Sequence, residues 1–191
     1  MIPDVTQKLY CDEVMKFRKV LNLTSIKDPS VFYDTFIKPS TELSKWINDG
    51  DIVLDIGSGM GVPGIPLLIH NSNVQGILVE RRKKRTEFIR HVIRKLKLNG
   101  VAYDADINDL DPLGATVCVA RAVSEVRLLL KMCDKHIIDG GKAVLPVPDD
   151  AVLPEVKGWF LFEDYHPHNM QRIACYVKGV QEAGGGVSRE T

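Results

Sequence analysis

The sequence has no surplus of charge of either sign. Its 191 residues include 25 Lys and Arg against 25 Asp and Glu, so the formal net charge is zero. A histone-like polycation and a protein that adheres to an anionic membrane surface both need a large positive excess, which this chain lacks. The overall balance therefore argues against both classes.

Long apolar runs and cysteine motifs are also missing. No run approaches the roughly 20 apolar residues of a membrane-spanning helix, and residues 1–4 lack the basic-then-apolar layout of a secretory signal. The four cysteines form no Cys-x-x-Cys pair and have no histidine beside them at zinc-ligand spacing. We therefore expect a cytoplasmic protein with reduced core thiols, no bound metal and no membrane association.

The size and apolar content indicate one main globular domain. The chain has a mass of 21.3 kDa and is 45% hydrophobic, enough for one sizeable core. We expect a helical N-terminal extension at 1–50, the main domain at 51–180 and a disordered tail at 181–191, which holds Gly184-Gly185-Gly186.

The main domain alternates between predicted strands and helices. Apolar runs predict strands at 52–56, 75–80, 101–105, 116–120 and 142–147, with helices from about 63, at 82–98 and at 124–138. Strands 159–165 and 172–177 have no helix between them, which predicts an antiparallel hairpin at the end of the sheet. The pattern indicates an α/β fold with a seven-stranded, mostly parallel sheet, whose ligand site lies at the carboxyl ends of the strands.

Local signals set the expected ends of these elements. In the extension we expect a helix at 5–21 and a second at 29–47 that is broken by Pro39. Asn99-Gly100 is expected to end the helix 82–98, and Gly140-Gly141 to precede the fifth strand.

The loop after the first strand, Asp55-Ile56-Gly57-Ser58-Gly59-Met60-Gly61-Val62-Pro63-Gly64, is the most informative stretch. Its glycines allow sharp turns and let the backbone lie against a ligand. Gly59, Gly61 and Gly64 also satisfy G-x-G-x-x-G, so an NAD-type dinucleotide has to be weighed. Pro63 and Pro66 remove two amides of the first helical turn, which a pyrophosphate would use as donors. This favours a cationic, phosphate-free adenosine ligand, S-adenosylmethionine, over NAD.

Acidic residues at the strand ends support the same ligand. Asp55 is placed to order the loop and attract a cation. Glu80, at the end of the second strand, is placed to accept hydrogen bonds from both ribose hydroxyls. After the third strand, Asp106 is expected to accept from the adenine amine and Ile107 to pack on the ring, with Ala105 beside them.

A basic segment interrupts the overall neutrality. Residues 81–97 hold nine Lys and Arg against one acid, Glu87, which gives this segment a charge of +8 and the rest −8. One explanation is the solvated polar face of an amphipathic helix. The excess of one sign favours contact with phosphates. Within this segment the residues expected to contact RNA are Arg82, Lys83, Lys84 and Arg85.

Several motifs, in order and spacing, are similar to those of one known family. The stretch from Leu54 to Leu67, with its double proline, resembles the signature of the GidB family, also called RsmG, bacterial methyltransferases that form 7-methylguanosine in small-subunit ribosomal RNA. The similarity covers residues of about 14 to 147. The other matching stretches are Asn22-Leu23-Thr24-Ser25, Lys84-Arg85-x-x-Phe88-Ile89-Arg90, Arg121-Ala122-Val123 and Gly140-Gly141.

The resemblance implies a class I methyltransferase fold of the Rossmann-like type, S-adenosylmethionine as donor and RNA as partner. It places the family's cofactor loop on Gly57, Ser58, Gly59 and Gly61, its ribose acid on Glu80, and its adenine-flanking segment on Ala105, Asp106 and Ile107. It also implies that Arg121 is the catalytic arginine, close to cofactor and target. An ion pair that closes the end of the fourth strand is the alternative role for Arg121.

Two stretches depart from the family pattern. Residues 35–40 read Thr-Phe-Ile-Lys-Pro-Ser where members have Arg-His-x-x-Asp-Ser, and 145–148 read Leu-Pro-Val-Pro where members have Leu-Lys-Gly. Both stretches are expected to flank the target. Three hypotheses therefore stay open: a methyltransferase for guanine N7 of ribosomal RNA, a methyltransferase for another RNA, a protein or a small molecule, and a catalytically silent RNA-binding protein that keeps cofactor affinity.

Overall fold

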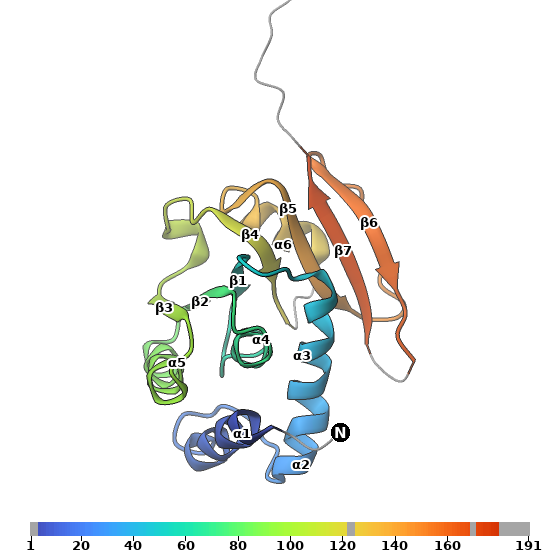
Figure 1. The fold of residues 1–191 in the computed structure, drawn as a ribbon. Coiled ribbons are helices and arrows are strands. Elements are labelled where there is room, and N and C mark those ends of the chain that lie inside the picture. The colour runs from blue at the N-terminus through green and yellow to red at the C-terminus, as the bar shows by residue number, and fades with distance from the viewer. Residues whose placement is uncertain (1–3, 122–124, 169–170, 180–191) are drawn as a thin grey trace, which may run out of the picture.

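The computed structural model describes residues 4–121, 125–168 and 171–179, and the expected tail at 181–191 lies outside them. One sheet of seven strands runs through the molecule in the order β3-β2-β1-β4-β5-β7-β6 (Figure 1). β1 to β5 pair in parallel, and β7 lies antiparallel between β5 and β6. The mostly parallel sheet with a hairpin at its end is confirmed. The strands are β1 Ile52–Ile56, β2 Gln75–Glu80, β3 Gly100–Asp104, β4 Ala115–Val119, β5 Ile137–Val147, β6 Trp159–Tyr165 and β7 Arg172–Lys178.

Side chains of the central strands feed two hydrophobic cores, one on each face of the sheet. In β4, Val117 and Val119 belong to one core, while Cys118 between them belongs to the other. This alternation follows from the two-residue repeat of a strand. The four cysteines are buried free thiols, as expected.

Helices cover both faces of the sheet. α4 Gly64–His70 and α5 Lys83–Leu96 pack on the first core, and α6 Val126–Cys133 packs on the second. A single turn, η3 Ile107–Asp109, follows β3. No helix in the described part of the chain is long and apolar enough to cross a membrane.

The residues before the sheet are helical. They form α1 Val5–Phe17 and then a run of short elements: α2 Pro29–Phe32, the π-helix η1 Tyr33–Ile37, α3 Lys38–Glu42 and the 3₁₀ turn η2 Leu43–Trp46. The expected break at Pro39 is wrong, because α3 continues through it. Pro39 lies in the first turn of α3, directly after the π-helix, where the missing N–H is tolerated.

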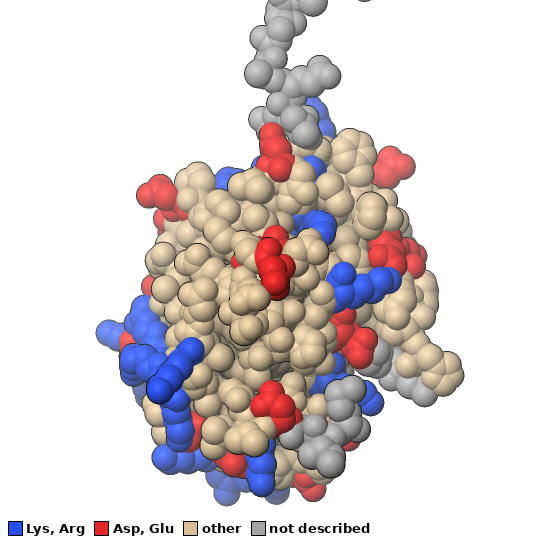
Figure 2. Space-filling view, viewed as in Figure 1, with Lys and Arg blue, Asp and Glu red and all other residues tan. Residues whose placement is uncertain are grey.

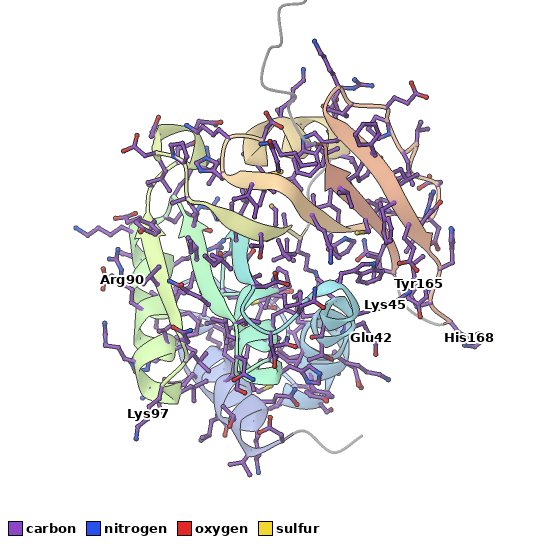
Figure 3. The ribbon with its side chains drawn as sticks, turned by 45° about the horizontal axis from the view of Figure 1, so that its top comes forward. Glu42, Lys45, Arg90, Lys97, Tyr165 and His168 are labelled. Carbon is purple, nitrogen blue, oxygen red and sulfur yellow. The ribbon has the colours of Figure 1, made fainter. Side chains whose placement is uncertain are left out.

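Three contacts fix these helices to the rest of the protein. The Tyr10 hydroxyl donates to the carbonyl of Met60 at 2.9 Å. Glu13 accepts from Lys95 of α5 at 2.6 Å. Lys45 lies 3.9 Å from the ring centre of Tyr165 in β6 (Figure 3). The first of these contacts reaches the glycine loop itself.

The glycines expected to bound elements lie inside strands. α5 ends at Leu96 with Lys97 in a left-handed conformation (φ 55°), so Asn99-Gly100 does not cap it. Gly100 begins β3, and a Cβ there would lie 2.9 Å from Leu68 Cδ1. The glycine is therefore required by the close approach of Leu68 and not by the end of the helix.

The expected boundary between the helix 124–138 and the fifth strand is also wrong. α6 ends at Cys133, and β5 begins at Ile137. The register between β4 and β5 shifts between Ala115 and Val117, so β5 is bulged there, and Gly140 takes a φ of 79° within it. A glycine pair that suggested a turn is therefore part of an irregular strand.

Candidate functional site

The glycine loop turns sharply at the carboxyl end of β1. Gly57, Gly59 and Gly61 have φ angles of 72°, 58° and 97°, which other residues rarely adopt. The N–H groups of Gly57 and Ser58 donate to the carbonyl of Val79, which fixes the loop to the end of β2. The loop is thus fixed at the strand ends, with Gly57 exposed, Gly59 half-buried, and Ser58, Met60 and Gly61 buried.

The start of α4 has no amide left for a pyrophosphate. Gly64 donates its N–H to Oδ2 of Asp55 at 2.9 Å, and Ile65 donates to the carbonyl of Gly61 at 2.7 Å. Pro63 and Pro66 carry no N–H. Within residues 63–66, all of which the structure describes, every donor is therefore absent or engaged, which agrees with the argument against NAD.

Asp55 lies beneath the loop and not in the wall of a cleft. The residue is 1% exposed, and its Oδ1 has no hydrogen-bond partner in the described structure. Burial raises the pKa of this carboxyl to about 7, despite the lowering effect of the Gly64 and Ser58 hydrogen bonds. Asp55 orders the loop as expected, and its attraction for a cation stays a prediction.

Glu80 joins the loop to the start of α5. Its Oε2 accepts from the N–H of Gly59 at 2.9 Å, and its Oε1 accepts from the N–H of Arg82 at 2.8 Å. A carboxylate oxygen has two lone pairs, so each of these oxygens can accept one further hydrogen bond.

A cleft of about 670 Å³ opens at the carboxyl ends of β1 to β4. This volume falls within the roughly 300–1,000 Å³ common for small-molecule sites. Arg81 and Asp106 form an ion pair in its wall, with 3.6 Å between Nη1 of Arg81 and Oδ2 of Asp106. From the predicted site, the lining includes Gly57, Glu80, Arg82, Ala105, Asp106, Ile107 and Arg121.

The other predicted cofactor residues lie behind this wall. Asp55, Ser58, Gly59 and Gly61 do not line the cleft, and Ser58 is 1% exposed. One wall is a surface that sequence reasoning missed, the first turns of α6. It includes Leu128, Leu129, Lys131 and Met132. The run Leu128-Leu129-Leu130 was the available signal, because three consecutive residues of a helix cannot all face the core, and Leu128 is 50% exposed.

Arg121 is held by the segment that departs from the family pattern. Its Nη2 donates to the carbonyl of Thr35 at 3.0 Å, and its guanidinium lies 4.2 Å from the ring centre of Phe36. Pro39 has no N–H to offer the Thr35 carbonyl, four residues earlier. The alternative role of Arg121 in an ion pair is wrong within the described residues, where a carbonyl and a ring hold it. Burial lowers the pKa of this guanidinium.

A second, much smaller recess of about 20 Å³ lies beside Arg121. Its lining brings together both stretches that depart from the family pattern, through Pro39 and the retained Ser40 from one and Pro146 from the other, next to Pro63 of the glycine loop. We call it the arginine recess. β5 accepts Pro146 because beyond Val144 it pairs with β7 alone. Arg121 therefore lines both the cleft and the arginine recess.

Lys and Arg side chains gather over α5 and the adjoining α1, at the lower left of Figure 2. Several of the nine basic residues are engaged within the protein: Arg85 with the carbonyl of Asn22, Arg90 with Glu87 and Lys95 with Glu13. The nine basic side chains of this segment are thus not all free to contact a partner. Four residues are expected to contact RNA. Within the described residues, the side chains of Arg82, Lys83 and Lys84 form no hydrogen bond or ion pair, whereas Arg85 is hydrogen-bonded to the carbonyl of Asn22.

A family model described as rRNA small subunit methyltransferase G matches residues 5–146. The chain belongs to the GidB family. Its expected membership is confirmed, and the protein is a methyltransferase. It is 30% identical over 174 residues to the ribosomal RNA small subunit methyltransferase G of Aeromonas salmonicida, covering 89% of this chain and 78% of the relative. The Vibrio cholerae protein of the same name is 31% identical over 151 residues, covering 78% and 67%.

Solved structures agree on the fold of this GidB protein. A putative methyltransferase, yhhF, from Escherichia coli superposes with a TM-score of 0.62 at 15% identity, covering 75% of this chain and 88% of that one. A putative methylase from Haemophilus influenzae gives 0.59 at 12% identity, covering 74% and 88%. The expected class I, Rossmann-like methyltransferase fold is confirmed.

Proposed function

We propose that this protein transfers the methyl group of S-adenosylmethionine to N7 of a guanine in small-subunit ribosomal RNA, in the cytoplasm. The observation that carries the proposal is the place of Arg121, which forms a wall of both the cleft at the strand ends and the arginine recess. A donor in the cleft and a guanine at the mouth of the recess, whose own volume of about 20 Å³ is too small for a base, would meet at this side chain. In this proposal residues 1–50 are an extension that supplies one side of the recess, and 51–180 are the methyltransferase domain.

The cleft suits the donor. S-adenosylmethionine supplies an electrophilic methyl group on a positively charged sulfur. The free lone pairs of Glu80 fit two ribose hydroxyls, and the backbone of Gly57 borders the same space. Asp106, whose pKa is lowered chiefly by hydrogen bonds from Asn108, stays ionised and can accept from an adenine amine. Ala105 offers apolar surface beside it, and Ile107, which also lines the cleft, is 3% exposed.

The remaining loop residues act indirectly. Ser58 and Gly61 fold the loop, Gly59 fixes Glu80, and Asp55 secures the start of α4. We assign these residues to the cofactor site as its support and not as contacts in the cleft wall.

The acceptor side needs positioning and no general base. Guanine N7 has an in-plane lone pair in the neutral base, so it can attack without first losing a proton. Alignment of reactants can supply on the order of 7–11 kcal/mol of the barrier. Arg121 presents a planar fork of donors that suits guanine O6 or a phosphate, and Phe36 and Thr35 hold that fork in place. Arg82, Lys83 and Lys84 provide the phosphate contacts next to the cleft.

The acceptor class is tested by methyl transfer from labelled S-adenosylmethionine. The substrates are small-subunit RNA from a strain lacking its own family member, the matching large-subunit RNA, and a cytosolic extract that contains proteins and small molecules. We expect label in the small-subunit RNA alone, and the activity should fall steeply with salt because phosphate contacts release counterions.

A different acceptor is the second candidate, and the prolines in the arginine recess favour it. Pro39 and Pro146 replace polar residues typical of the family at this place. Label that enters a small molecule or protein, with a rate independent of salt, would support this candidate and refute RNA as the acceptor. Cofactor and RNA binding without turnover would instead support the catalytically silent alternative.

A further inference from the structure

An apolar groove separates the end of α1 from the first turns of α5. It has a volume of about 630 Å³ and lies outside both the cleft and the arginine recess. Phe17 and Phe88 meet edge to face on its floor, with ring centres 5.8 Å apart. Val20 stands 80% exposed on its rim, an unusual position for an apolar side chain. The lining is Phe17, Val20, Leu21, Lys83, Lys84, Glu87, Phe88 and His91.

The rim of this groove is basic on both sides. Lys83 and Lys84 line it from α5, and on the α1 side Lys16 Nζ lies 5.2 Å from the ring centre of Phe17. The single acid of the lining, Glu87, is paired with Arg90 at 2.6 Å. An apolar floor flanked by these three lysines is complementary to a strand with flat apolar bases and a charged backbone. The groove is a poor match for an ordinary apolar peptide, because such a peptide has no anionic groups to pair with the lysines.

The groove is continuous with the cofactor cleft along the chain. Arg81 and Arg82 line the cleft, and the next two residues, Lys83 and Lys84, line the groove. Arg85 then donates to the carbonyl of Asn22 at 2.6 Å and so fixes the segment after α1 against α5. A single strand that follows these consecutive cations passes from the groove to the cleft.

We propose that this groove, which we call the base groove, binds an unpaired nucleobase of the RNA acceptor, a few nucleotides away from the methylated guanine. The base packs on Phe17, Val20 and Leu21, and its phosphates contact Lys83 and Lys84. The proposal rests on RNA being the acceptor. It adds a recognition site that acts through stacking, which tolerates any base, and that selects single-stranded over paired RNA.

The test uses two substitutions that keep charge unchanged. Val20→Ser removes exposed apolar surface with little risk to folding, and Phe17→Leu removes a ring while it keeps apolar volume. Val152→Ser is the matched control, because Val152 is 88% exposed and belongs to neither the groove nor the cleft. The probes are a fluorescent 12-nucleotide single-stranded RNA and an abasic strand of the same length and charge.

We expect the Val20→Ser, Phe17→Leu double variant to bind the RNA about tenfold more weakly, as loss of one stacked base would cause. Its affinity for the abasic strand and for S-adenosylhomocysteine should equal that of the unaltered protein and of Val152→Ser. In methyl transfer the KM for RNA should rise and kcat should stay unchanged.

Unchanged RNA affinity in the double variant, or an equal loss on the abasic strand, would overturn the base groove and leave the proposed function standing. Absence of RNA binding by the unaltered protein, with S-adenosylhomocysteine still bound, would overturn RNA as acceptor and the base groove with it. A double variant that binds double-stranded RNA as weakly, relative to the unaltered protein, as it binds single-stranded RNA would also contradict a site for unpaired bases.

Discussion

Replacement of Asp55 by Asn should make the protein more stable at neutral and alkaline pH. The carboxyl is buried beneath the glycine loop, and its pKa is raised from 3.8 to about 7, chiefly by burial. A raised pKa means that the folded state holds its proton more tightly than the unfolded state. Stability is therefore lost as pH rises from about 4 to about 7, and the loss is complete above that.

The size of the effect follows from the two pKa values. A change of one pKa unit corresponds to 1.36 kcal/mol, so ionised Asp55 costs about 4 kcal/mol above pH 7. Part of this cost is already present at pH 5, and about 3 kcal/mol accrues between pH 5 and pH 9. Asn keeps an acceptor for the Gly64 N–H and carries no charge. Relative to the unaltered protein, Asp55→Asn should thus gain about 3 kcal/mol between these pH values.

Urea unfolding followed by the fluorescence of Trp46 and Trp159, both buried, measures this gain. It should be run at several pH values without added cofactor, with Asp150→Asn, a change at an exposed residue, as a control for surface charge. A gap between Asp55→Asn and the unaltered protein that stays constant from pH 5 to pH 9 would refute the reasoning. It would show that the carboxyl ionises as easily in the folded as in the unfolded chain.

Three other substitutions probe the donor and acceptor sides. Glu80→Gln replaces one acceptor by an amide donor that faces the N–H of Gly59 or Arg82, and should weaken S-adenosylhomocysteine binding by about 2 kcal/mol; calorimetry that shows unaltered affinity would contradict the role of Glu80. Phe36→Ala removes the ring beneath Arg121, whose cation–π contact is worth about 1 kcal/mol, and should lower kcat severalfold with unchanged cofactor affinity. Phe36→Tyr keeps the ring and should retain activity. Equal kcat in both variants and the unaltered protein would count against positioning by Phe36. Gly61→Ala places a Cβ 2.5 Å from Ile65 Cγ1 and should lower the melting temperature more than Gly57→Ala, whose Cβ meets nothing within 4 Å; the reverse order in a thermal melt would show that the loop relaxes.

The sheet could be predicted because its signals are local. β1 and β2 begin and end where the apolar runs 52–56 and 75–80 do, since buried parallel strands need continuous apolar sequence. The glycine loop and Glu80 could be placed for the same reason, because both directly follow such strands. The hairpin of β6 and β7 followed from the lack of a helix between two apolar runs.

Long-range contacts account for what the sequence did not show. Thr35 and Phe36 hold Arg121 from 85 or more positions away, and no periodicity reports such a contact. The bulge at Gly140 depends on the register of β5 with β4. Gly100 must be a glycine because Leu68 of α4 lies against it. Arg85, Arg90 and Lys95 likewise bond within the fold, so residues 81–97 have fewer free cations than the sequence indicates.

The central claim is methylation of guanine N7, and nucleoside analysis of the product tests it most directly. Small-subunit RNA lacking its 7-methylguanosine is incubated with the protein and S-adenosylmethionine, digested to nucleosides and separated by liquid chromatography with mass detection. We predict one new 7-methylguanosine per RNA, and none with Arg121→Ala. A methyl group on another atom or base, or no RNA product alongside a methylated small molecule, would contradict it.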